Sequence, residues 1–108
     1  MVNLFLDFMK KEVKNLVELE KILNQTNFFE ALGIDKIGVF GSFARGEKAN
    51  DLDLLLDKVN DFVKLISIKE ELEEKIGKKI DLVIDKYANP IILHRAKKDL
   101  VYVKKYKD

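Results

Sequence analysis

The chain has 108 residues, 47% of them hydrophobic and 36% charged, so it is large enough to bury one core and too apolar to be disordered. Its 20 basic and 19 acidic side chains leave a net charge of +1, which argues against a general nucleic-acid binder. The absence of cysteine excludes disulfides and thiolate metal sites. With neither a membrane-spanning stretch nor a signal peptide in the sequence, we expect a single cytoplasmic domain over residues 1–108.

The first predicted element is an amphipathic helix over residues 3–24. Spacings of three and four between apolar residues indicate one buried helix face, made of Leu4, Phe5, Phe8, Met9, Val13, Leu16, Val17, Leu19 and Leu23. Asn27, with Glu30 three residues later, fits a capping box that begins a short helical turn, and Gly33 would end that turn.

Three strands and two further helices follow. The strands are predicted over residues 36–40, 52–56 and 79–84. A helix over 61–76 would turn Phe62, Leu65, Ile66, Leu72 and Ile76 inward and end at Gly77. Ser67 with Glu70 could cap a break inside it, so the pattern allows one helix or two. Asn89-Pro90 fits the start of the last helix, and residues 100–103 fit a short edge strand. This order predicts an α+β fold, with a small mixed sheet of about four strands and helices packed on it.

A glycine-serine turn follows the first strand. Gly41 lets a ligand approach the backbone, and Ser42 lies near the N-cap of a short helix predicted after it. Free backbone N–H groups and the helix dipole favour an anion such as phosphate at that point. A glycine turn between a strand and a helix is common, so this feature alone does not establish a phosphate site.

Acidic residues line one face of the second strand. Alternate strand residues share a face, so Asp51 and Asp53 point away from the leucines between them. Two carboxylates so placed repel each other unless they are solvated or bridged by a cation, and oxygen ligands suit Mg²⁺ or Mn²⁺. Asp57 falls at the far end of the same strand, where a solvated acid is the simpler interpretation.

Asp81 lies in a third strand that is otherwise apolar. An acid there must be paired, hydrated or bound to metal. It joins the acidic cluster if its strand lies beside that of Asp51 and Asp53. The alternative is an ion pair with one of three nearby lysines, Lys78, Lys79 or Lys86. Together, the turn and the three acids are typical of a metal and triphosphate site for phosphoryl or nucleotidyl transfer.

Three segments carry a family resemblance that spans nearly the whole chain: GSFARG at 41–46, DLDLLLD at 51–57 and KKIDLVI at 78–84. They resemble the minimal nucleotidyltransferase (MNT) family of the DNA polymerase beta superfamily. The resemblance implies that Gly41 and Ser42 hold the phosphates of ATP, and that Asp51 and Asp53 bind two Mg²⁺ ions. It implies that Asp81 binds the catalytic metal and helps to activate the acceptor hydroxyl. Arg45 would contact phosphate or tether the loop.

The sequence departs from the family pattern at two points. Eight residues, 43–50, separate Gly-Ser from the first aspartate, where ten are usual, and Asn50 replaces the usual serine before that aspartate. An ångström of misplacement can cost on the order of a hundredfold in rate, so binding is a safer expectation than turnover.

The resemblance also implies a function and a partner. Larger members of the superfamily grip the acceptor with a second domain, for which this chain has no room, so a partner or an oligomer would supply that grip. In the MNT family the partner is a HEPN-domain RNase toxin, and the MNT protein is an antitoxin that transfers AMP from ATP to a toxin tyrosine. The alternatives are a binding module that neutralises the toxin without turnover, and an α/β domain with scattered acids. His94, the only histidine, has no partner motif and is expected at the surface.

Overall fold

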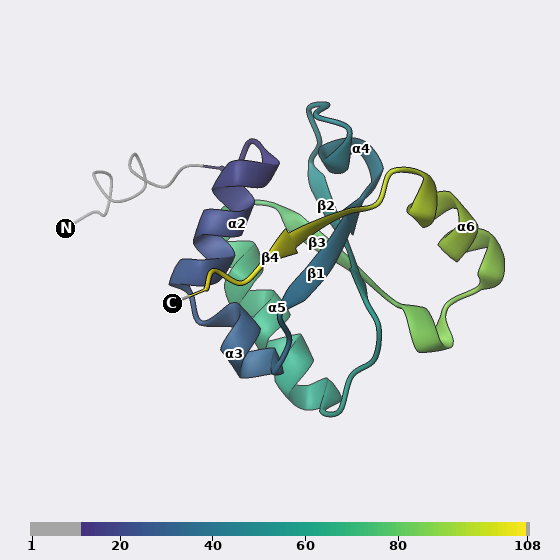
Figure 1. Ribbon diagram of the computed structural model, residues 1–108. Coiled ribbons are helices and arrows are strands. Elements are labelled where there is room, and N and C mark those ends of the chain that lie inside the picture. Colours follow the sequence, from purple (N-terminus) through teal and green to yellow (C-terminus); the bar gives the residue numbers. More distant parts are fainter. Residues whose placement is uncertain (1–11, 108) are drawn as a thin grey trace.

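One four-stranded sheet organises residues 12–107, the part of the chain that the computed structural model describes (Figure 1). The strands are β1 (Lys36–Phe40), β2 (Asp51–Leu56), β3 (Lys79–Ile84) and β4 (Val101–Lys104). Their order is β3-β2-β1-β4, with β1 antiparallel to both of its neighbours and β2 parallel to β3. This arrangement confirms the mixed sheet predicted from the sequence.

The helices are distributed unevenly around the sheet. They are α2 (Leu16–Gln25), α3 (Phe28–Leu32), α4 (Gly41–Ala44), α5 (Phe62–Ile76), the 3₁₀ turn η1 (Asp85–Tyr87) and α6 (Pro90–Lys98). Figure 1 shows α2, α3 and α5 gathered on one side, while α4 and α6 lie toward the opposite end of the strands. Within residues 12–107 no helix combines the length and the apolar character needed to cross a lipid bilayer.

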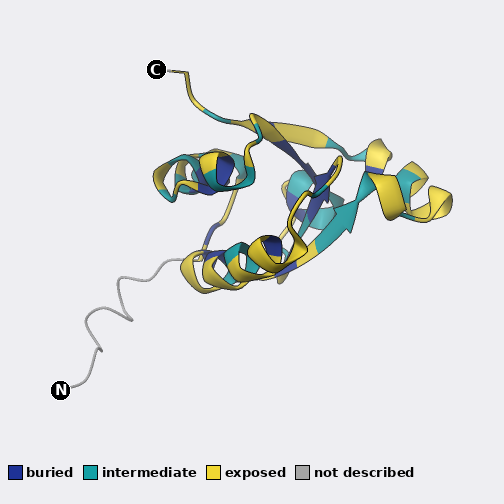
Figure 2. Ribbon diagram, turned by 90° about the horizontal axis from the view of Figure 1, so that it is seen from below, coloured by how far each residue is buried: buried dark blue, intermediate teal, exposed yellow. Residues whose placement is uncertain are grey.

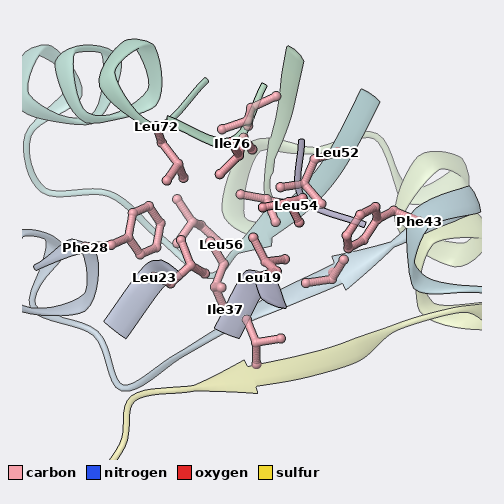
Figure 3. Packing of buried hydrophobic residues seen from close by; sticks show 14 of the residues in the cluster. Leu19, Leu23, Phe28, Ile37, Phe43, Leu52, Leu54, Leu56, Leu72 and Ile76 are labelled. Carbon is pink, nitrogen blue, oxygen red and sulfur yellow. The ribbon is translucent and has the colours of Figure 1, made fainter. Parts of the chain in front are cut away.

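The core lies between the sheet and helices α2, α3 and α5. Alternation along β2 turns Leu52, Leu54 and Leu56 to this side, and each is at most 4% exposed. Leu19 and Leu23 of α2 and the residues of α5 meet them there, as Figure 3 shows. Dark blue, which marks buried residues, is concentrated in this region in Figure 2, whereas α6 is mostly exposed.

Side-chain caps fix where the longer helices begin. Asn15 accepts a hydrogen bond from the Glu18 N–H of α2 at 2.9 Å, and Asp61 accepts one from the Lys64 N–H of α5 at 3.0 Å. Asn89 accepts one from the Ile91 N–H at 2.8 Å. The predicted Asn-Pro start of α6 is therefore confirmed.

The prediction for the first helix is wrong in part. Within the described chain this helix begins at Leu16, because Asn15 caps it there, and Val13 packs in the core from a non-helical segment. Residues 3–11 of the predicted helix lie outside the described residues. Val17, expected on the buried face, is 77% exposed.

The short helix predicted between Asn27 and Gly33 is confirmed as α3, but the predicted capping box does not form. Asn27 adopts a left-handed backbone with φ of 62°, and its side chain makes no capping hydrogen bond to α3. The possible break at Ser67 and Glu70 does not occur, since α5 is continuous over its 15 residues.

The buried face of α5 is narrower than predicted. Leu65, Leu72 and Ile76 are buried, but Phe62 and Ile66, which were expected to point inward, are 48% and 55% exposed. These two residues lie on the first turns of the helix, away from the leucine-lined core.

Helical side chains satisfy backbone groups at both outer edges of the sheet. At β4, Glu20 accepts from the Lys104 N–H at 2.9 Å, and the Asn24 amide bonds both the Lys104 carbonyl and the Tyr106 N–H. At β3, Glu73 accepts from the Ile80 N–H at 2.8 Å. Carboxylate and amide groups thus take the place of a further strand at these positions.

The packing of α2 leads to a first prediction. Replacing the fully buried Leu19 with alanine should lower the free energy of unfolding by about 2–5 kcal/mol, because it leaves a cavity against β2. The same truncation at the exposed Val17 should change it by about 0.5 kcal/mol or less. Urea unfolding followed by circular dichroism measures both values, and equal losses would contradict the burial described for α2.

Candidate active site

Strand register brings the predicted acids together on the face of the sheet opposite the leucines. Asp53 of β2 pairs directly with Asp81 of the parallel strand β3, and Asp51 lies two residues before Asp53 on the same face. Across the other edge of β2, Asp53 pairs with Phe40, the residue before the glycine-serine turn. The expectation that the Asp81 strand lies beside the Asp51–Asp53 strand is therefore confirmed.

Gly41 packs directly against Asp53. The backbone of Gly41 has φ of +74°, which favours glycine, and a Cβ atom added there would overlap with Oδ2 of Asp53. Glycine is thus needed at this position for two reasons: it adopts the positive φ of the turn, and it leaves room for the Asp53 carboxylate. The turn and the acids lie together, although β3 begins 38 residues after Gly41 in the sequence.

The environment of Asp53 opposes its ionisation. Burial, followed by the nearby charges of Asp81 and Asp51 and a hydrogen bond with Asp81, raises the pKa of the Asp53 carboxyl above its usual range. Carboxyl groups held this close favour a shared proton or a cation between them. The site therefore has the electrostatic character of a cation-binding centre.

The alternative role of Asp81 as half of an ion pair finds no support in the described chain. Of its three candidate partners, Lys78 instead bonds the side chain of Glu12 at 2.7 Å and also the Ala49 carbonyl. No ion pair to Asp81 occurs within residues 12–107. Asp81 is exposed on the site face and is free to contact a ligand.

Arg45 tethers the loop in this structure. Its guanidinium donates to both carboxylate oxygens of Glu47, at 2.9 and 3.2 Å, and to Oδ2 of Asp99 after α6, at 2.7 Å. It also lies 3.4 Å from Oγ of Ser42. The two carboxylates hold the pKa of Arg45 above its usual value. These contacts support the tethering role, and the phosphate role considered for Arg45 stays a prediction.

The chemistry of the site fits a hard divalent cation. Carboxylate oxygens are the ligands that Mg²⁺ prefers, and a cation would offset both the burial of the Asp53 carboxylate and its repulsion by Asp81 and Asp51, which together raise the pKa of Asp53. Within residues 12–107, no three acidic, histidine or cysteine side chains lie close enough together to hold a metal ion by themselves. The fit to a cation therefore rests on the chemistry and charge of the carboxylates around Asp53.

The remaining candidates lie away from this centre or differ slightly from expectation. Asp57 and His94 are exposed, as the sequence suggested. Helix α4 begins at Gly41 with Phe40 as its N-cap, so Ser42 lies in the first turn and does not cap it. The sequence reasoning missed Asp99, the second carboxylate partner of Arg45, because 54 residues separate the two and no local pattern connects them.

A group of exposed apolar side chains lies near the outer side of β3. Phe62 of α5 and Tyr87 of η1 stack with ring centroids 6.2 Å apart. Together with Val83 and Ile92 they line a groove that runs from β3 to α6. Val83 lies two residues after Asp81 on the same strand and on the same face of the sheet.

The contact between Gly41 and Asp53 can be tested with a matched pair of variants. Gly41→Ala and Gly46→Ala both place alanine at positive φ, which should cost about 1–2 kcal/mol of stability in each case. Nothing lies within 4 Å of a Cβ added at Gly46, so only Gly41→Ala should displace the Asp53 carboxylate. We expect Mn²⁺ affinity to fall at least about tenfold in Gly41→Ala alone. Equal Mn²⁺ binding by the two variants would contradict this contact.

The raised pKa of Asp53 predicts that replacing this residue with asparagine increases folding stability by an amount that depends on pH. The folded state holds the Asp53 proton more tightly than the unfolded state does, so stability falls as pH rises from the usual value of 3.8 through the raised one. Asp53→Asn should therefore be more stable than wild type in urea at pH 7, and this advantage should shrink as the pH approaches 3.8.

The exposed Asp57→Asn is the control, and it should show no such trend. Addition of Mg²⁺ should stabilise wild type more than Asp53→Asn. An Asp53→Asn variant that is less stable than wild type at pH 7 would rule out the repulsion described here.

Comparisons with known proteins agree with this geometry. The sequence is similar to "Protein adenylyltransferase MntA" from Thermococcus cleftensis, with 35% identity over 94 residues that span 82% of this chain and 95% of the relative. The fold resembles a crystal structure of a toxin–antitoxin with AMP-PNP, with a TM-score of 0.57, 19% identity and coverage of 79% of this chain and 76% of that one. It also resembles a structure of a tri-AMPylated Shewanella oneidensis HEPN toxin in complex with MNT antitoxin, with a TM-score of 0.52, 16% identity and coverage of 80% and 73%.

The family itself is identified by a match over most of the chain. The profile of the family described as "Polymerase beta, Nucleotidyltransferase" matches residues 17–107, which include every strand of the sheet and all the candidate site residues. The nucleotidyltransferase fold expected from the three sequence segments is confirmed. The chain belongs to the polymerase beta nucleotidyltransferase family.

Proposed function

We propose that this protein is a Mg²⁺-dependent protein adenylyltransferase that transfers AMP from ATP to a tyrosine of a HEPN-domain toxin, and that it acts as an antitoxin. The observation that carries the proposal is the position of Asp53, which packs against Gly41 on one side and pairs with Asp81 on the other. A phosphate-binding turn and carboxylates in direct contact are what nucleotidyl transfer requires. The protein acts as a single domain in the cytoplasm, where ATP and Mg²⁺ are available.

Each site residue has a role in this proposal. Gly41 and Ser42 bind the phosphates of ATP through the backbone N–H groups of the turn, since the glycine leaves room for close approach. Asp51, Asp53 and Asp81 would hold two Mg²⁺ ions. When bound, these ions supply charge neutralisation for the triphosphate and for the acceptor oxygen. Arg45 holds Ser42 and the loop in place through its bonds to Glu47 and Asp99, so its role is mainly to position the turn.

The transfer step balances with these groups. The tyrosine oxygen attacks the α-phosphorus of ATP and forms the new oxygen–phosphorus bond. The bond between the α-phosphorus and its bridging oxygen breaks, and pyrophosphate leaves with the electron pair. Asp81, exposed at the edge of the acidic cluster, accepts the proton of the tyrosine hydroxyl.

Two observations support a protein as acceptor. The related MntA is named a protein adenylyltransferase, and the solved complex with an MNT antitoxin contains an AMPylated HEPN toxin. On this chain, the apolar groove at Phe62, Tyr87 and Ile92 also includes Leu82 and Val83, the two residues that follow Asp81 in β3. Contiguous exposed apolar side chains are typical of protein contact surfaces.

A labelled transfer assay tests the proposal. The protein is incubated with α-labelled ATP, Mg²⁺ and a HEPN-domain toxin, or with the same toxin carrying phenylalanine at its acceptor tyrosine. We expect the label on the tyrosine-containing toxin alone. The double variant Asp51→Asn with Asp53→Asn should lose at least about a hundredfold in rate, since losing even the residues that orient metal ligands costs up to that much.

Asp57→Asn serves as the control for charge removal on the same strand and should transfer AMP at close to the wild-type rate. Acid-dependent ATP binding without label on the toxin would overturn the enzyme in favour of a module that binds nucleotide and toxin. The eight-residue loop between Ser42 and Asp51 is the feature that favours this second outcome. Failure of the wild type to bind ATP would overturn both the adenylyltransferase and the nucleotide-binding module.

A further inference from the structure

Lys78 is the one buried residue with a polar or charged side chain in residues 12–107. It is 8% exposed, and its side chain 6%. A buried ammonium group is costly unless it has partners. Lys78 has two, since its Nζ donates to Oε1 of Glu12 at 2.7 Å and to the backbone carbonyl of Ala49. The transfer step described above makes no use of this residue.

The contacts of Lys78 converge on the segments that carry the site. Ala49 lies two residues before Asp51, at the end of the loop between α4 and β2. The Lys78 ammonium also lies 5.8 Å from the ring centroid of Phe43, a buried residue of the short helix that begins at Gly41. Lys78 itself immediately precedes β3 and is three residues from Asp81. A single ammonium group therefore connects α4, the loop and β3.

The loop is fastened at both ends by basic side chains. Arg45 holds its beginning through Glu47 and Asp99. Lys78 holds its end through the Ala49 carbonyl. Asp51 enters β2 directly after this second attachment and pairs across the strands with Lys79, the neighbour of Lys78. The position of Asp51 relative to Asp81 thus depends on where Ala49 is held.

We propose that Lys78 is a positioning residue for the metal site, which fixes Asp51 relative to Asp53 and Asp81 by anchoring the Ala49 carbonyl to the start of β3. The inference rests on the proposed metal-binding function of these acids. Lys78 contacts neither nucleotide nor metal in this role. Its effect is on the geometry of the carboxylates, so it should alter metal affinity more than the rate at saturating metal.

The principal test is Mn²⁺ binding in the presence of α,β-methylene-ATP, a nucleotide that cannot be transferred. Water-proton relaxation measures the Mn²⁺ dissociation constant directly. Lys78→Met keeps the length of the side chain and removes its hydrogen bonds, and we expect it to weaken Mn²⁺ binding by about tenfold or more. Lys75→Met, at an exposed lysine near the end of α5, removes the same charge without a contact to the loop and should bind Mn²⁺ like wild type.

A purely structural role for Lys78 gives a different result. In that case Lys78→Met would lower the melting temperature, and the protein that remains folded would bind Mn²⁺ with wild-type affinity, which would overturn the proposal. In the transfer assay, positioning predicts a higher Mg²⁺ requirement with kcat largely restored at saturating Mg²⁺. A lower kcat with an unchanged Mg²⁺ requirement would also overturn it.

A second variant keeps the test decisive if Lys78→Met does not fold. Glu12→Gln, at a side chain that is 54% exposed, removes the ion pair and leaves the bond from Lys78 to Ala49. The proposal expects its Mn²⁺ dissociation constant to change by less than about threefold, and a tenfold change would mean that the anchor at Ala49 is not what matters. If wild type binds Mn²⁺ but transfers no AMP, the proposed enzymatic activity is refuted. The proposal for Lys78 still stands in that case, because its effect is measured on Mn²⁺ binding.

Discussion

The parallel pairing of β2 with β3 is the constraint on which the rest of the site depends. Burial of Leu52, Leu54 and Leu56 against the helices leaves one orientation for β2, and the intervening acids must then face the other way. The register that pairs Asp53 with Asp81 follows from the same apolar pattern on both strands. A slip of one residue would turn the leucines to solvent and the acids into the core, so the hydrophobic effect that stabilises the fold also sets the positions of the carboxylates.

The site and the core act in opposite directions on stability. Leucine burial favours the folded state, whereas burial of the Asp53 carboxyl, followed by the charges of Asp81 and Asp51, raises the pKa of Asp53 and so disfavours the ionised, folded form. The positive φ at Gly41 is a second unfavourable feature, because few residues other than glycine adopt this backbone conformation. The acidic site therefore lowers the free energy of unfolding, and binding of a cation and a triphosphate there would raise it again. Functional sites in other proteins concentrate such unfavourable geometry in the same way.

Sequence reasoning was accurate wherever a local pattern reported a physical constraint. The alternation Asp-Leu-Asp-Leu predicted both the strand and its two faces, and Asn89-Pro90 predicted the start of α6. It failed for the side-chain cap of Asn27, whose backbone is left-handed, and for Val17, which is exposed although it fits the helical period. The partners of Lys78 and Asp99 were beyond its reach, because their contacts join segments 29 to 66 residues apart. Motifs predict the candidate site residues, but the contacts that hold those residues in place come from segments far apart in the sequence and follow from the tertiary fold.

The side chains that cap the sheet edges limit how another chain can associate with this one. Glu20 and Asn24 occupy backbone groups along β4 and its continuation, and Glu73 occupies the Ile80 N–H of β3. An incoming strand would have to displace charged or amide groups to extend the sheet there, which disfavours both amyloid-like stacking and recognition by strand addition. A protein that binds this molecule must therefore recognise the shape and chemistry of its side chains.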